Sequence, residues 1–449
     1  MSPATRASET VAAARACAYG VLRRVFEQGA YADRALAGAA GGLDPRDRAL
    51  AMRLVYGTVQ RRATLDHVAG ELAGRDAATI DAPLLAALRL GLYQLLFLDS
   101  VPAHAAVNDS VTLAKRAGGG GFSLVNAILR RAAREGRELL DTLDDRTPQS
   151  AALRHSVPAW IAELWWRELG ADGARALLAS VNEPAESSLR ANTLVTDAVS
   201  LAAALPFATA VPGEPPEAVI ALEPFDVQRS RAWLEGACMP QSRASMLVAH
   251  AVAPQSGERV LDLCAAPGGK TTHLAALMGA AGEIVAVERH PGRADALRRT
   301  ARRMHAANVR VEVADAGAPL AEPPFDRVLL DPPCSGLGTL RSRPDLRWRV
   351  SPSDVAELAA QQSRLLSAAA ALVSPGGVLV YSTCTISPDE NERQIEAFLE
   401  RDRSFRSDDL QAEYPAWAHP RAEHHLLALP HVQGSDGFFI ARLRRAHAG

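Results

Sequence analysis

The residues best suited to chemistry in this sequence are acids and thiols that stand at the ends of short apolar runs. From Gly257 onward, β-rich runs alternate with helical runs, a pattern typical of a doubly wound, largely parallel sheet. The segments that end or follow these runs are Asp262-Leu-Cys-Ala-Ala-Pro-Gly-Gly-Lys-Thr-Thr272, Glu288, Asp315, Asp331-Pro-Pro-Cys334 and Ser382-Thr-Cys384. Because the carboxyl ends of parallel strands meet at one edge of a sheet, we expect these side chains to share one site.

The turn after the first run is suited to a nucleoside-type ligand. Gly268 and Gly269 let the backbone approach a ligand at the start of a helix, and Glu288 follows at the separation of about 20 residues at which an acid meets ribose hydroxyls. A phosphate-binding P-loop would need glycine where Cys264 stands, and the G-x-G-x-x-G pattern of dinucleotide sites is absent. A series of acids with few phosphate donors favours a nucleoside that carries a positive centre, and S-adenosylmethionine fits that description.

Two further regions precede the sheet. From Thr5 to about Arg137, apolar residues recur at three- and four-residue spacing and predict a bundle of roughly five to seven helices. Its expected breaks are Gly41-Gly42 with Asp44-Pro45, Asp81-Ala-Pro83, Ser100-Val-Pro102 and Gly118–Gly121. The polar segment 141–148 then leads to a small α+β region whose expected core residues are Trp160, Trp165 and Trp166.

The predicted fold class is therefore multidomain: an all-α helical bundle at 1–140, a small α+β middle domain at 150–240 and an α/β domain at 241–449. A short strand is expected in the middle domain at Ala218–Leu222. The strands expected in the α/β domain are Arg259–Leu263, Glu283–Val287, Val309–Val313, Arg327–Leu330, Val378–Ser382 and Phe438–Leu443.

Composition excludes several classes of protein. With 48% hydrophobic and 22% charged residues, the 449-residue chain can bury real cores, and its net charge of −2 provides no global positive field for nucleic acid. The five cysteines are scattered without metal-ligand spacing, so neither a disulfide framework nor a zinc site is indicated. The apolar stretch Leu84–Leu98 is interrupted by Arg89 and predicts a buried helix rather than a membrane span. We expect a cytoplasmic protein.

Three motifs in the sheet domain resemble those of RNA cytosine-C5 methyltransferases: Cys264-Ala-Ala-Pro-Gly-Gly-Lys270, Asp331-Pro-Pro-Cys-Ser-Gly336 and Tyr381-Ser-Thr-Cys-Thr385. The closing segment Asp436–Arg442 is similar to the last strand of that family. Two segments of the bundle, 102–108 and 125–130, are similar to the NusB-like domain that precedes the catalytic domain in the bacterial Sun/Fmu type. The resemblance covers most of the chain and is weakest between Ala185 and Trp233.

The resemblance implies a Rossmann-like catalytic domain that uses S-adenosyl-L-methionine, and a NusB-like RNA-binding domain. It implies 16S ribosomal RNA as partner, with cytosine 967 as the expected target, and no membrane or metal. We expect a monomer. By the same resemblance, Cys384 is the nucleophile that adds to carbon 6 of the base, Cys334 assists product release and Asp331 lies between cofactor and base. The residues expected to bind the cofactor are Cys264, Ala265, Ala266, Pro267, Gly268, Gly269, Lys270, Glu288, Asp315 and Asp331.

Alternatives are weighed against this interpretation. A non-catalytic RNA-binding scaffold would not need both Cys334 and Cys384, and a methyltransferase for exocyclic amines would have an aromatic residue in place of Cys334. Cys17 and Cys238 are expected to be ordinary small apolar residues. The arginines of segment 293–303 are either a solvated helix face or an RNA contact. The basic loop that holds Arg341, Arg343, Arg347, Trp348 and Arg349 is the stronger candidate for RNA contact.

Overall fold

The computed structural model describes residues 11–118, 120–223, 225–318 and 320–447 and divides the chain into two compact units. Unit 1 comprises the chain up to Glu183 together with Arg343–Arg349, and unit 2 comprises Pro184–Ser342 and the chain from Val350 onward. The expected helical residues 5–10, and Gly119 of the glycine run, lie outside the described residues. Within the described ranges, every helix is too short or too polar to cross a bilayer.

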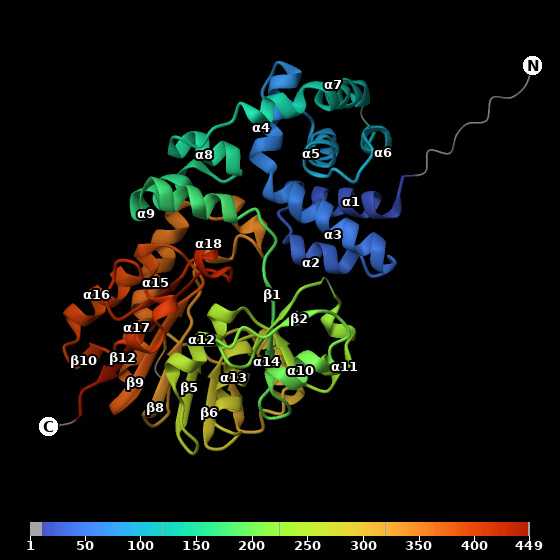
Figure 1. Cartoon of the computed structure of the whole chain (residues 1–449). Coiled ribbons are helices and arrows are strands. Elements are labelled where there is room, and N and C mark those ends of the chain that lie inside the picture. The colour runs from blue at the N-terminus through green and yellow to red at the C-terminus, as the bar shows by residue number, and fades with distance from the viewer. Residues whose placement is uncertain (1–10, 119, 224, 319, 448–449) are drawn as a thin grey trace, which may run out of the picture. The chain divides into compact units, whose positions relative to one another are not determined.

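Unit 1 is helical, as predicted. Its helices are α1 (Ala13–Gln28), α2 (Ala32–Ala39), α3 (Pro45–Gln60), α4 (Arg62–Ala73), α5 (Ala82–Phe97), α6 (Ala103–Arg116), α7 (Phe122–Asp141), α8 (Pro148–His155) and α9 (Ala159–Ser180) (Figure 1). The predicted break before α3 is confirmed, since the Asp44 side chain accepts a hydrogen bond from the backbone N–H of Asp47 and Pro45 takes the first helical position. α5 is buried on nearly all sides, which its continuous apolar sequence predicts.

The helices α8 and α9 belong to unit 1, whereas the sequence analysis grouped them with the strands that follow. Trp165 of α9 is fully buried, as expected of a core residue, whereas Trp160 and Trp166 are only half-buried, so the core prediction is wrong for these two. The remainder of the predicted middle domain lies in unit 2 and forms a four-stranded antiparallel sheet in the order β2-β3-β1-β4. Its strands are β1 (Ser187–Ala191), β2 (Thr209–Ala210), β3 (Ala218–Ala221) and β4 (Cys238–Pro240), with α10 (Ala198–Ala204) and α11 (Arg231–Leu234) between them.

The larger sheet of unit 2 has the order β10-β12-β9-β8-β5-β6-β7, and β11 pairs with β12. Its strands are β5 (Arg259–Leu263), β6 (Glu283–Val287), β7 (Val309–Glu312), β8 (Phe325–Leu330), β9 (Val373–Thr383), β10 (Phe405–Ser407), β11 (Leu426–Ala428) and β12 (Phe438–Arg445). The strands from β7 to β9 are parallel, and β12 pairs antiparallel with β9. The prediction of a doubly wound, largely parallel sheet is therefore confirmed.

The helices of this region are α12 (Arg243–Val252), α13 (Gly269–Leu277), α14 (Pro291–Arg303), α15 (Pro352–Ala371), α16 (Glu392–Arg401), α17 (Leu410–Glu413) and α18 (Pro430–Gln433). The chain runs from β5 outward to β7 in one direction and from β8 to β9 in the other. Right-handed crossovers in opposite directions place α13 and α15 on opposite faces of the sheet. The strand order thus reverses between β5 and β8, and ligands bind at such a switch point.

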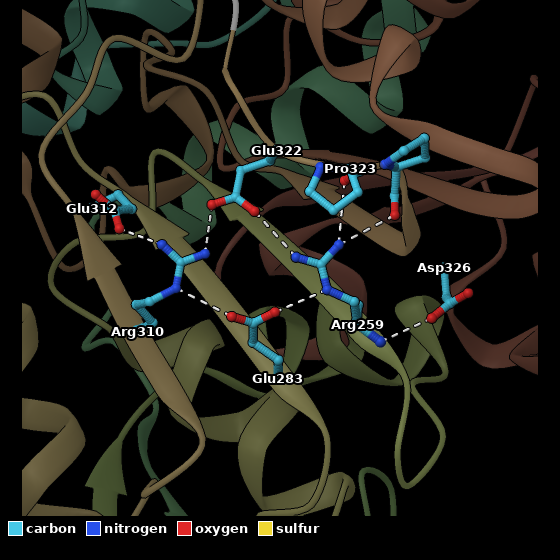
Figure 2. Close-up of polar contacts among 8 residues, drawn as sticks. Arg259, Glu283, Arg310, Glu312, Glu322, Pro323 and Asp326 are labelled. Carbon is cyan, nitrogen blue, oxygen red and sulfur yellow. Dashed lines mark hydrogen bonds and ion pairs between the residues drawn. The ribbon is translucent and has the colours of Figure 1, made fainter.

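The amino ends of β5, β6 and β7 are joined by an ion-pair network (Figure 2). The Glu283 carboxylate lies 2.9 Å from Nε of Arg259 and 3.1 Å from Nε of Arg310. Glu322 contacts the same two arginines, at 3.1 Å from Arg259 and 2.6 Å from Arg310. The network ties three parallel strands together at the edge opposite to their carboxyl ends.

Candidate active site at the carboxyl edge of the sheet

Strand register brings the three predicted motifs together in unit 2. Leu263 at the end of β5 is paired with Leu330 at the end of β8, and Leu330 is paired with Tyr381 of β9. The segments that begin at Cys264, Asp331 and Ser382 therefore leave neighbouring strands at the same edge. This edge is the switch point identified above.

The turn from β5 into α13 is shaped by its backbone. Cys264 has φ 63° and Gly268 has φ 101°, both in the left-handed region. A Cβ at Gly268 would lie 2.5 Å from a methyl group of Leu297, so only glycine fits there. Burial, with nearby carboxylates, raises the pKa of Cys264 to about 12, so this thiol stays protonated and contributes mainly backbone to the turn.

Two of the predicted acids, Glu288 and Asp315, line one cavity. Glu288 is buried, and its Oε1 accepts a hydrogen bond from the backbone N–H of His290 at 2.9 Å. Asp315 accepts one from the backbone N–H of Gly317 at 2.9 Å. The cavity beside them is lined by Cys264, Val287, Glu288, Arg289, His290, Arg293, Ala314, Asp315, Ala316, Pro333, Gln361 and Leu365. Three of the residues assigned to the cofactor thus share one pocket.

Asp262 at the end of β5 carries an unsatisfied buried atom. Its Oδ2 accepts a hydrogen bond from the Thr271 hydroxyl at 2.6 Å, while Oδ1 is buried without a partner among the described residues. Burial raises the pKa of Asp262 to about 7. A buried acceptor without a donor favours a ligand that brings one.

Lys270 and Asp331 form a half-buried ion pair, with Nζ 2.7 Å from Oδ2. The other carboxylate oxygen of Asp331 accepts a hydrogen bond from the Ser382 hydroxyl at 3.0 Å. Burial lowers the pKa of Lys270, but the negative charges around it outweigh burial and the net pKa is raised. The lysine is therefore a stable cation that links the motifs of β5, β8 and β9.

Cys334 and Cys384 face each other with their sulfur atoms 3.3 Å apart. Both residues are half-buried. The hydrogen bond to Cys384, burial and nearby negative charges raise the pKa of Cys334 well above that of an ordinary thiol. The pair therefore favours a proton on Cys334, and Lys270 is close enough for the charge of Cys384 to contribute to its raised pKa.

Sequence reasoning missed several residues that brace this edge. Arg190 of β1 is fully buried, and its guanidinium donates hydrogen bonds to the Gly269 carbonyl at 2.6 Å and to the Thr272 hydroxyl at 2.9 Å. Glu390 is also fully buried and accepts hydrogen bonds beside both cysteines. The strand that carries Arg190 lies where the family resemblance was weakest, so no motif indicated it.

One group of side chains in the described ranges could together hold a metal ion: Glu217, His250 and His273, whose ligand atoms lie within 4.8 Å of one another. Oε1 of Glu217 is 2.9 Å from Nε2 of His250 and 2.6 Å from Nε2 of His273. Burial lowers the pKa of His273 to about 3. These contacts connect the segment before β3 to α12 and α13, and none of the three residues lines the cavity described above.

The prediction that the loop from Arg341 to Arg349 contacts RNA is wrong for Arg347 and stays a prediction for the other four residues. Arg347 is fully buried and donates to the carbonyls of Ser156 and Val181 at 3.1 and 3.0 Å, inside unit 1. The other internal hydrogen bonds run from Trp348 to Val59, from Arg349 to Gly29 and Ala30, and from Arg341 to Pro184 and Gly434. Arg343 is the exposed residue of this group. The Arg347 guanidinium satisfies two buried carbonyls, and a buried acceptor without a partner is costly.

The arginines of α14 divide into two sets. Arg293 donates to the Ala266 carbonyl at 2.8 Å, and Arg303 donates to the Cys238 carbonyl at 3.0 Å and lies over the ring of Trp233. Arg299 and Arg302 are exposed. RNA contact by this helix stays a prediction for the exposed pair.

Two family models match this chain, one in its amino-terminal part and one in its carboxyl-terminal part. A family model described as 16S rRNA methyltransferase RsmB/F matches residues 249–444, and the NusB family model matches residues 12–134. The chain is 39% identical over 452 residues to a probable ribosomal RNA small subunit methyltransferase B of Synechocystis, covering 96% of this chain and 99% of that protein. It is 34% identical over 411 residues to the protein of the same description from Bacillus subtilis, covering 90% and 92%.

Solved structures agree with this result. The crystal structure of PH0851 superposes with a TM-score of 0.81 at 27% identity and covers 97% of this chain and 99% of that one. The fold is also that of NSun6 from Pyrococcus horikoshii, with a TM-score of 0.60 at 22% identity over 65% of this chain. A non-catalytic scaffold is not supported, because the relatives are named as methyltransferases. This chain therefore belongs to the RsmB/F family of ribosomal RNA small subunit methyltransferases, with a NusB-family helical domain at its amino end.

Proposed function

We propose that this chain transfers the methyl group of S-adenosyl-L-methionine to carbon 5 of a cytosine in 16S ribosomal RNA, with Cys384 as the nucleophile. The observation that carries the proposal is the pair of thiols, 3.3 Å apart, beside the Lys270–Asp331 ion pair at the switch point. The family supports methyl transfer to small-subunit RNA. Carbon-5 chemistry on cytosine requires one thiol to add to carbon 6, and a second thiol beside it can assist release of the product.

The residues around the cavity fit this cofactor. Glu288 and Asp315 offer carboxylate oxygens for the hydroxyl and amino groups of an adenosine, and Cys264 to Lys270 form the turn between them and Asp331. The orphaned Oδ1 of Asp262 offers an acceptor to a cationic amino group. When bound, the cofactor supplies an electrophilic methyl group on a sulfonium.

The proposed reaction begins with Cys384. Carbon 5 of cytosine is a weak nucleophile, so the Cys384 thiolate adds to carbon 6 and makes carbon 5 enamine-like. Carbon 5 then forms a bond to the methyl carbon, whose bond to sulfur breaks with both electrons going to the sulfur. A base removes the proton from carbon 5, and the electrons of that C–H bond restore the ring double bond and expel the Cys384 thiolate.

The other two residues of the site have separate proposed roles. Because its pKa is raised, Cys334 holds a proton next to the Cys384 sulfur and is placed to assist product release. Asp331 accepts hydrogen bonds on both oxygens, which suits a residue that holds the amino edge of the base between the cofactor and Cys384. Lys270 keeps Asp331 in position and stabilises negative charge on Cys384.

The RNA substrate is also part of the proposal. The expected family target is cytosine 967 of 16S ribosomal RNA. In this proposal the helical region 1–140 binds RNA, 150–240 is the middle domain and 241–449 is catalytic, although the compact units divide the middle segment between them. We propose that the protein acts in the cytoplasm as a monomer, because every proposed site residue comes from unit 2 of one chain.

Substitution of the two cysteines tests the proposed function. Cys384→Ala should abolish both methylation and any covalent RNA adduct, since no thiol is left to add to carbon 6. Cys334→Ala should form the adduct but release it slowly, so that protein and RNA migrate together on a denaturing gel. Cys17→Ala, in the helical unit, serves as control and should behave like the unsubstituted protein. An adduct that persists in Cys384→Ala and is missing in Cys334→Ala would reverse the two roles.

A further inference from the structure

Glu390 lies fully buried between the two turns that carry the cysteines. On the Cys334 side, its Oε1 accepts a hydrogen bond from the backbone N–H of Ser335 at 2.8 Å, and its Oε2 accepts one from the Ser335 hydroxyl. On the Cys384 side, Oε2 accepts from the Thr385 hydroxyl at 3.3 Å. Ser335 and Thr385 each directly follow a cysteine, so one carboxylate joins the two cysteine turns.

Other contacts complete this connection. The Ser335 and Thr385 hydroxyls lie 2.6 Å apart. Gln362 of α15 donates to the Pro333 carbonyl at 2.8 Å and to Glu390 Oε1 at 3.1 Å. The Tyr381 hydroxyl donates to the backbone carbonyl of Glu390 at 2.7 Å. The carboxylate is therefore held from three parts of unit 2: the turn after β8, α15 and the turn after β9.

The hydrogen bonds to Glu390 are stronger than the direct contact between the two thiols. Burial raises the pKa of Glu390, and hydrogen bonds from Ser335, Gln362 and Thr385 offset only part of that rise. A buried carboxyl group is costly unless it is fully hydrogen-bonded, so each donor contributes to keeping it there. The contact between the sulfur atoms is weak by comparison, because a thiol is a weak donor and a weak acceptor. The contact between the sulfur atoms therefore contributes little to fixing their separation.

We propose that Glu390 is a positioning residue that sets the separation of the Cys334 and Cys384 sulfur atoms through Ser335 and Thr385. The proposal rests on the proposed function, in which the two thiols act in sequence on one cytosine. Glu390 itself does not touch the reacting atoms in this scheme. It keeps the second thiol within reach of the first throughout the reaction.

Two substitutions separate the position of the side chain from its charge. In Glu390→Gln the amide oxygen can replace Oε1 and accept from Ser335 N–H and Gln362, while the amide NH₂ can donate to the Ser335 and Thr385 hydroxyls, which also accept. This variant keeps the connection. Glu390→Ala leaves the donors on both turns without their acceptor. The matched control is Asp389→Asn, since Asp389 is the adjacent carboxylate and its side chain pairs with Arg393 at the surface.

The first measurement does not depend on methylation. A trivalent arsenical, phenylarsine oxide, binds tightly only where it can form bonds to two neighbouring thiols, and mass spectrometry of peptides locates the bridge. We expect a Cys334–Cys384 bridge in the unsubstituted protein, in Asp389→Asn and in Glu390→Gln. In Glu390→Ala we expect the bridged fraction at a limiting arsenical concentration to fall about tenfold, because the two sulfurs no longer share a fixed separation.

The second measurement is steady-state methylation. Misplacement of a reacting group by about 1 Å costs on the order of 100-fold in rate, so Glu390→Ala should lower kcat by about that factor. The KM for S-adenosylmethionine should stay within about twofold, because Glu390 does not line the cofactor cavity. Glu390→Gln should recover most of kcat. An unfolded fraction would lower the apparent kcat without changing KM, so thermal unfolding of each variant must show that it is folded at the assay temperature.

Thr385→Val keeps the test decisive if Glu390→Ala does not fold. It removes the hydroxyl that links the Cys384 turn to Ser335 and Glu390, and should lower the bridged fraction in the same direction. The positioning role of Glu390 would be overturned if arsenical bridging were unchanged in Glu390→Ala and Thr385→Val, or in whichever of these two variants folds. Equal loss in Glu390→Gln and Glu390→Ala would overturn it too. Neither result depends on the proposed function, which fails separately if Cys384→Ala still methylates RNA.

Discussion

Asp262 shows how strongly one residue's chemistry depends on its surroundings. The carboxyl group is 1% exposed, has a single hydrogen-bond donor in Thr271 and has a pKa raised to about 7 by burial. The ordinary aspartate pKa is about 3.9. Between these two values the folded protein binds a proton that the unfolded chain has released.

This difference predicts how stability depends on pH. Where the folded state binds more protons, the free energy of unfolding falls as pH rises, so the contribution of Asp262 is complete below about pH 4 and lost by about pH 7. Between pH 5 and pH 7 the loss is on the order of 2–3 kcal/mol. Asp262→Asn should remove this pH dependence of the free energy of unfolding, and urea unfolding without added cofactor measures the change. Asp315→Asn, at an exposed acid, is the control, and equal pH slopes for Asp262→Asn and the unsubstituted protein would contradict the prediction.

At the scale of the elements, the two edges of the parallel sheet have different tasks. The carboxyl edge carries the site residues, which are only partly satisfied by one another. The amino edge carries the network of Arg259, Glu283, Arg310 and Glu322, in which each charge contacts at least two partners (Figure 2). Networks hold their side chains at a lower entropic cost than isolated pairs do, so this edge can stabilise the sheet without constraining the site.

We therefore predict separable effects from a change in this network. Glu283→Gln should lower the free energy of unfolding by about 1 kcal/mol at low salt and by less at high salt, because its partly exposed ion pairs are screened. Hydrogen bonds from Arg259 and Arg310 lower the pKa of Glu283, so its contribution is also lost as pH falls through the acidic range. Urea unfolding at two salt concentrations tests this, with the exposed Glu400→Gln as control. A loss of methylation in a stably folded Glu283→Gln protein would show that the two edges are coupled.

At the scale of the whole molecule, neither compact unit is a single continuous segment of the sequence. Residues 343–349 leave unit 2 after the Asp331 motif, belong to unit 1, and the chain then returns to unit 2. Arg347 anchors this segment by hydrogen bonds to buried acceptors from the ends of α3, α8 and α9. Burial lowers the pKa of Arg347 to about 9, so its charge depends on these acceptors. The polypeptide segment next to a proposed catalytic residue thus also completes the helical unit.

The helical unit also carries the predicted contact with RNA. Several of its arginines are paired internally, among them Arg15 with Asp109 and Arg89 with Asp66. Arg130 and Arg134 on α7 are exposed. Replacing both with Gln should weaken RNA affinity and reduce the steepness of log affinity against log salt by roughly 1.4–1.8, about 0.7–0.9 for each phosphate contact.

Binding of a 16S RNA fragment at several salt concentrations measures this slope. Arg23→Gln is the matched control, since the Arg23 guanidinium already pairs with Glu27 at 2.7 Å. The affinity for S-adenosylmethionine should not change in either protein. If the double variant keeps the same RNA affinity and salt slope as the control, this face of α7 does not bind RNA.

Much of the sheet and of the proposed site could be predicted from the sequence. The expected bounds of β5 and β6 are those of the structure, because a strand buried on both faces is a continuous apolar run that local sequence reveals. Cys334, Cys384, Asp331 and Glu288 were expected at one edge, because residues that end parallel strands meet there whatever the intervening sequence. The breaks between helices were likewise local, since proline, glycine and capping residues act within one turn.

Only the tertiary structure decided which polar side chains face protein and which face solvent. Arg347 and Arg299 are both arginines in basic segments, yet one is fully buried against backbone carbonyls and the other is exposed. Arg190 and Glu390 brace the site through partners far along the chain or on other elements. A charged side chain is buried when distant segments supply enough hydrogen-bond partners to offset its desolvation, and that sum over distant partners cannot be computed from the local sequence.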